Sequence, residues 1–113
     1  MKKLSKPSRE LAAQIGTEVD FENRFIGYRL HKRMGPSPVT MYSFGEVVGF
    51  LCRPQPQIDF VALKAWVLTA MGDRELADRI GAVIAADTQP FQKNLSIRDL
   101  MALRLLQCKK LVG

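Results

Sequence analysis

Hydrophobic residues recur three and four positions apart along most of the chain, which is the spacing of amphipathic helices. Each such stretch follows a Ser or Asp, a residue that can accept a hydrogen bond from the first helical turn. The predicted helices are 9–15 after Ser8, 44–52 after Ser43, 60–71 after Asp59, 74–87 after Asp73 and 97–112 after Ser96. The pattern therefore predicts a mainly α protein of four to five helices.

Residues 60–71 carry apolar side chains on nearly every side of the predicted helix, because only Lys64 and Thr69 are polar in this stretch. A helix that is hydrophobic almost all round is typical of the middle of a core. We therefore expect a compact bundle in which the other helices pack around residues 60–71.

The segment before residue 43 fits two patterns. The alternation of Ile26, Tyr28 and Leu30 is typical of a strand, whereas the aromatic residues of the same stretch share one face of a helix. We favour the strand, followed by a turn in the Gly-Pro-Ser-Pro sequence that begins at Gly35. The expected β-ribbon lies within residues 24–42 and pairs 24–31 with 39–42.

The length and composition are those of one domain. With 113 residues, of which 47% are hydrophobic and 25% charged, the chain is expected to fold as a single domain over residues 1–113. Residues 1–7 are predicted to be a flexible basic lead-in, and residues 53–58, with two prolines, a stiff connector. No apolar run approaches the roughly 20 residues of a membrane span, and the N-terminus has no apolar signal segment. We therefore expect a cytoplasmic protein that does not bind membranes.

A short phrase occurs twice, as RELAAQIG at residues 9–16 and as RELADRIG at residues 74–81. Such a phrase opens the second helix of many helix-turn-helix domains, which need a supporting helix before it and a recognition helix after it. The first copy has too little chain before it for a supporting helix. The second copy is followed by residues 82–92, which contain no Arg or Lys to contact bases. We interpret the repeat as two ordinary helices of similar composition.

Residues that could perform catalysis or bind metals are scarce. His31 is the single histidine and lies among positive charges. Together with Cys52 and Cys108 it cannot provide the four ligands of a structural zinc site. The acidic residues are expected on solvated faces, and there is no Gly-rich phosphate loop. The sequence favours a non-enzymatic protein with no cofactor, metal or small-molecule substrate, whose cysteines are reduced thiols.

The predicted C-terminal helix has more apolar side chains than one buried face accommodates. Arg104 lies in the middle of its broad apolar face, while Leu103 and Leu106 point elsewhere. One interpretation keeps these residues within the fold, with Arg104 extending to water and Leu103 covered by a loop. The other, which we favour, makes Leu103, Arg104 and Leu106 the contact of an adaptor or small subunit with a protein partner or a second copy.

A nucleic-acid-binding regulatory protein is the alternative function. The net charge is +6, and residues 1–34 hold eight Lys and Arg against four Asp and Glu. Within this region the candidate contact residues are Arg24, Tyr28, Arg29, Lys32 and Arg33. Basic side chains beside an aromatic ring can bind phosphates and stack on a base. The same charges could also serve only to keep the protein in solution.

Overall fold

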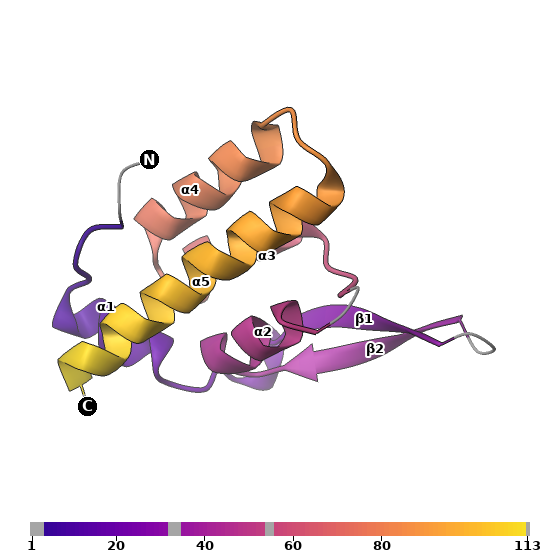
Figure 1. Cartoon of the computed structure of the whole chain (residues 1–113). Coiled ribbons are helices and arrows are strands. Elements are labelled where there is room, and N and C mark those ends of the chain that lie inside the picture. The colour runs from indigo at the N-terminus through magenta and orange to yellow at the C-terminus, as the bar shows by residue number, and fades with distance from the viewer. Residues whose placement is uncertain (1–3, 32–34, 54–55, 113) are drawn as a thin grey trace.

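The computed structural model describes residues 4–31, 35–53 and 56–112. The described elements are helices and one small antiparallel sheet, so the predicted mainly α class and the predicted β-ribbon are both confirmed (Figure 1). In chain order they are α1 (Arg9–Ile15), a 3₁₀ turn η1 (Phe21–Asn23), β1 (Phe25–His31), β2 (Gly35–Met41), α2 (Phe44–Leu51), α3 (Phe60–Thr69), α4 (Arg74–Ala85) and α5 (Pro90–Val112).

The long helix α5 is the element around which the others gather. It runs across the molecule in Figure 1 and packs against α1, α2 and α4, whereas α3 packs chiefly against α4. The prediction that residues 60–71 form the centre is therefore wrong. Leu63, Trp66 and Val67 of α3 are buried, but Val61 and Leu68 face solvent. The all-round apolar pattern did not show which side of the helix would be covered.

The start of α5 is also earlier than the sequence pattern indicates. We expected the helix to begin after Ser96, but it begins at Pro90. Proline is favoured at the first helical position, because its fixed φ suits the helix and the N–H that it lacks would be unpaired there anyway. The backbone N–H of Lys93 donates to the carbonyl of Gln89 at 3.1 Å, which makes the first turn continuous with the rest of α5.

The other four predicted caps are confirmed by the geometry. Ser8, Ser43 and Asp73 each accept a hydrogen bond from the backbone N–H three residues later, at 3.1 Å. Asp59 accepts from the N–H groups of Val61 and Ala62. These bonds satisfy donors that a helix leaves unpaired at its start, so they fix where α1, α2, α3 and α4 begin.

β1 and β2 form a hairpin that extends away from the helices (Figure 1). The strands are antiparallel, with Phe25 opposite Met41 and Tyr28 opposite Pro38. The turn expected at residues 35–38 is wrong, because β2 begins at Gly35 and includes both prolines, which an edge strand tolerates. On its other side, Tyr28 exchanges two backbone hydrogen bonds with Gln57, at 2.9 and 3.3 Å. The end of the predicted 53–58 connector is thus held against β1, while residues 54–55 lie outside the described part.

The hairpin is joined to the helical body at its base. The ring of Phe25 lies 5.7 Å from that of Trp66, centroid to centroid, and the indole N–H donates to the carbonyl of Asn23 at 2.6 Å. A Cβ atom at Gly27 would lie 2.8 Å from the ring of Phe50. Only glycine therefore lets β1 cross so close to α2.

Candidate functional site

The outer side of α5 carries two exposed leucines, both of which the sequence analysis selected. Leu103 is 38% exposed and Leu106 is 51% exposed. Because they are three residues apart, they are neighbours on the helix surface. Within the described residues they form an apolar spot on the side of α5 that no other element covers.

Leu103 also belongs to a groove between α4 and α5. Two adjoining hollows of about 270 and 260 Å³ share Val83, Ser96 and Leu100, and Leu103 lines the second. The small side chains of Ala82 on α4 and of Ala86 directly after it leave the space open. We call this feature the α4–α5 groove; its lining residues are Arg79, Ala82, Val83, Ala86, Thr88, Ser96, Asp99, Leu100 and Leu103. Its apolar floor and polar rim are suited to receive apolar side chains of another molecule.

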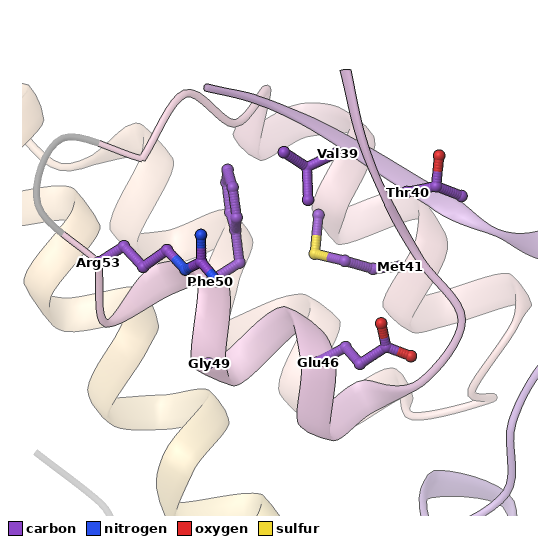
Figure 2. A pocket seen from close by; sticks show the side chains of 7 residues that line it. All are labelled: Val39, Thr40, Met41, Glu46, Gly49, Phe50 and Arg53. Carbon is purple, nitrogen blue, oxygen red and sulfur yellow. The ribbon is translucent and has the colours of Figure 1, made fainter. Parts of the chain in front are cut away.

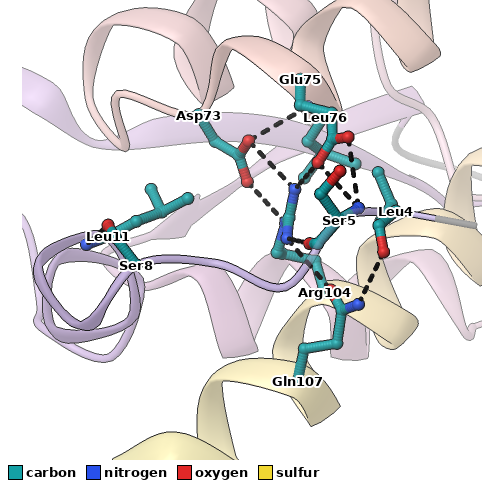
Figure 3. A network of polar contacts seen from close by, with 9 residues as sticks. All are labelled: Leu4, Ser5, Ser8, Leu11, Asp73, Glu75, Leu76, Arg104 and Gln107. Atoms are coloured by element: carbon teal, nitrogen blue, oxygen red, sulfur yellow. Dashed lines mark hydrogen bonds and ion pairs between the residues drawn. The ribbon is translucent and has the colours of Figure 1, made fainter.

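Arg104 points the other way, into the protein, and is only 1% exposed. Its Nε lies 2.8 Å from Oδ2 of Asp73, and its Nη2 lies 2.7 Å from Oε1 of Glu75 (Figure 3). Its Nη1 donates to the carbonyl of Ser5 at 2.7 Å and to Oε1 of Gln107 at 3.0 Å. The partner that a buried guanidinium needs is therefore supplied by the chain itself, and Arg104 is not available to contact another molecule.

The pKa values of two groups around Arg104 are shifted. Burial disfavours the charged form of Glu75, but hydrogen bonds from Ser5 and Arg104 outweigh it, so the pKa of this carboxyl lies below its usual value. Burial raises the pKa of the Cys108 thiol. Cys52, in contrast, is exposed. The buried thiol is therefore held in its neutral, unreactive form.

Among the described residues proposed for nucleic acid, Tyr28 and Arg29 lie on different faces of the hairpin. Arg24 stacks over the ring of Phe21 at 3.8 Å and donates to the carbonyl of Phe21 at 2.7 Å. Tyr28 and Arg29 are both exposed, but as successive residues of β1 they lie on opposite faces of the hairpin. The remaining two, Lys32 and Arg33, lie outside the described residues.

A further hollow of about 300 Å³ lies between β2 and α2, and Figure 2 shows the side chains that line it. Its single carboxylate belongs to Glu46, which already accepts hydrogen bonds from the backbone N–H of Tyr42 and the hydroxyl of Ser43. It therefore completes the capping of α2. Arg53 is the one basic side chain in the lining.

Neither a metal-binding cluster nor a membrane-spanning helix occurs among the described residues. No group of three or more His, Cys, Asp and Glu side chains is close enough to hold a metal ion. None of the helices in this part of the chain has the length and apolar character needed to cross a membrane.

By its fold, the described chain is a mainly α protein whose five helices carry one antiparallel hairpin. No family model matches the chain, no curated protein resembles it significantly, and no solved structure has a significantly similar fold. Its function therefore has to be argued from its own surfaces.

Proposed function

We propose that the protein is a non-enzymatic adaptor or small subunit that binds a protein partner through the outer side of α5 and the α4–α5 groove. The observation that carries the proposal is the exposure of Leu103 at the edge of the groove, with Leu106 beside it. Arg104, which the sequence analysis included in this contact, is no longer part of it.

The free energy gained by burying these two leucines in a contact is modest. Full burial of a leucine is worth about 1.5–3 kcal/mol, so covering the exposed parts of two leucines contributes roughly 2 kcal/mol. A partner side chain that fills the groove adds to this. Lys109 and Lys110 are exposed in the last turn of α5, so an apolar partner segment flanked by acidic residues fits this surface best.

The cytoplasm is the compartment that we propose. Cys52 and Cys108 are both free thiols, and a solvent-exposed free thiol such as that of Cys52 is expected where glutathione and thioredoxin keep cysteines reduced.

The test is affinity capture from the native host with the wild-type chain and with the double variant Leu103→Asp, Leu106→Asp. A charge on each leucine should abolish the contact, because a carboxylate cannot enter an apolar seat without losing its hydration. The matched control is Leu68→Asp on α3, which replaces the same residue type at a similar exposure of 42%.

We expect at least one protein to be captured by the wild type and by Leu68→Asp but lost with the double variant, and to bind the purified wild type directly. The proposal fails if the double variant is folded by circular dichroism and captures the same proteins as the wild type. Nuclease treatment of one arm tests the alternative. Nucleic-acid binding would be favoured instead by two results together. The captured partner would be lost only on nuclease treatment, and the wild type would shift mixed DNA and RNA in a gel with an affinity that falls steeply with salt.

A further inference from the structure

The N-terminal segment is attached to the helices in the way that a bound peptide is attached to its receptor. We call residues 4–8 the strap. Leu4 and Pro7 are buried, whereas Ser5 and Lys6 between them are exposed. The flexible lead-in predicted for residues 1–7 is therefore not seen in the described residues 4–7. The strap buries two apolar side chains and presents the intervening ones to solvent.

The backbone of the strap makes hydrogen bonds to α4 and α5 (Figure 3). The N–H of Ser5 donates to both carboxylate oxygens of Glu75, at 3.0 and 3.2 Å, and its carbonyl accepts from Arg104. The carbonyl of Leu4 accepts from Nε2 of Gln107 at 3.0 Å. Main-chain hydrogen bonds combined with seats for spaced apolar side chains are the features by which proteins recognise extended peptides.

The receptor side is built without the strap. Glu75 comes from α4 and Gln107 from α5, and these two helices pack against each other. Arg104 is held by Asp73 and Gln107, neither of which belongs to the strap. The seat formed by Asp73, Glu75, Arg104 and Gln107 should therefore keep its shape when the strap leaves.

The charges of the two sides are complementary. The seat places two carboxylates, Asp73 and Glu75, around one guanidinium, so its net charge is negative. The strap holds Lys6, and in sequence it follows directly after two further lysines. A basic extended peptide is thus the ligand that the seat favours electrostatically.

We propose that this seat is a peptide-binding groove that the chain's own N-terminal strap occupies in cis. In trans it binds an extended basic segment of another protein, in which an aliphatic residue is followed three positions later by a proline, as Leu4 is by Pro7. The tethered strap competes at an effective concentration in the millimolar range. Release of the strap is therefore needed for tight binding in trans. This seat lies on the inner side of α5 and is independent of Leu103 and Leu106.

The experiment uses the full chain with Leu4→Asp, which removes the apolar anchor of the strap. The probe is a fluorescein-labelled peptide with the sequence of residues 1–8, and its binding is followed by fluorescence anisotropy. A second variant, Ser5→Pro, removes the N–H that donates to Glu75 and leaves Leu4 intact. Lys109→Ala is the control, because it removes an exposed lysine that belongs to neither the strap nor the seat.

We expect the peptide to bind both strap variants at least about tenfold more tightly than it binds the wild type or Lys109→Ala, because the competing cis ligand is weakened. Adding Gln107→Ala to Leu4→Asp should reduce that binding, and a probe peptide that itself carries Leu4→Asp should not bind. The proposal is overturned if the strap variants are folded by circular dichroism and bind no better than the wild type. It is equally overturned if both unfold, since the strap would then be an integral part of the core.

Discussion

Replacing Arg104 by methionine measures how much the buried charge network contributes to the free energy of unfolding. Arg104→Met keeps an unbranched apolar stem but removes the guanidinium, and leaves the carboxylate of Asp73, which is 1% exposed, without its cation. Breaking a buried ion pair by removing one partner costs about 3–5 kcal/mol. A domain of ordinary stability has only about 5–15 kcal/mol in total. At about 4 °C per kcal/mol for a chain of this size, Tm should fall by about 12–20 °C.

Two companion variants show whether burial of charge is the cause. Glu75→Gln removes the other ion pair of Arg104, but the Glu75 side chain is 36% exposed, so the loss should be at most about 1 kcal/mol. The double variant Arg104→Met, Asp73→Asn removes both buried charges and keeps an amide oxygen to cap α4. It should be more stable than Arg104→Met alone, because no buried charge remains unpaired.

Urea unfolding followed by tryptophan fluorescence provides the assay, since Trp66 is the single tryptophan and lies buried against Phe25. The free energies of unfolding of the four proteins form the comparison. The reasoning is refuted if Arg104→Met costs no more than Glu75→Gln. It is also refuted if the Asp73→Asn change destabilises the Arg104→Met background further.

Three other predictions follow from single positions. Gly27→Ala should destabilise the protein by about 1–3 kcal/mol, because the added Cβ would meet a phenylalanine ring. Gly81→Ala displaces only the flexible end of a lysine and should stabilise α4 by about 0.5–1 kcal/mol. Urea unfolding should therefore show changes of opposite sign in the free energy of unfolding, and changes of the same sign would contradict the argument. The pKa of Glu75 is lowered in the folded state, so its stabilising contribution is complete above pH 4.5, its unperturbed value, and is lost as the pH falls through the lower folded pKa; amide NMR signals of the strap should shift in that acid range in the wild type and not in Glu75→Gln. A thiol reagent should modify Cys52 quickly and Cys108 only after unfolding; rapid reaction of both in the native protein would mean that the core around α5 opens readily.

The sequence predicted local structure well where one residue type decides the outcome. Ser8, Ser43, Asp59 and Asp73 cap helices in the structure as expected, because capping depends on a side chain and its own next few residues. The same rule was wrong at Ser96, which was expected to cap the last helix but lies inside α5, because α5 begins at Pro90. Proline ends a helix from inside and begins one at its first position, and the flanking residues did not discriminate between the two.

The long-range parts of the site could not be predicted in the same way. The pattern of α5 showed that Arg104 needed a partner, but not that Asp73 and Glu75, about thirty residues earlier, would provide it. That pairing depends on how α4 packs on α5. Residues 1–7 were interpreted as a flexible basic lead-in, because three of them are lysines and no apolar segment follows. The strap is held by backbone hydrogen bonds and by the burial of Leu4 and Pro7, and two isolated buried residues show neither a helix nor a strand period.

The prolines of β2 determine what can happen at the free edge of the hairpin. Both backbone polar groups of Tyr28 point toward Gln57 and away from β2. Tyr28 and Pro38 are therefore a non-hydrogen-bonded pair of the antiparallel ladder, in which the backbone nitrogen of Pro38 points away from β1. Pro36, two positions away, faces the same way. At Pro36 and Pro38 the outer edge of β2 therefore has carbonyl acceptors but lacks the N–H donors that an incoming strand would need. Copies of this protein cannot extend the sheet from one molecule to the next along that rim, which protects a projecting hairpin from edge-to-edge fibre growth.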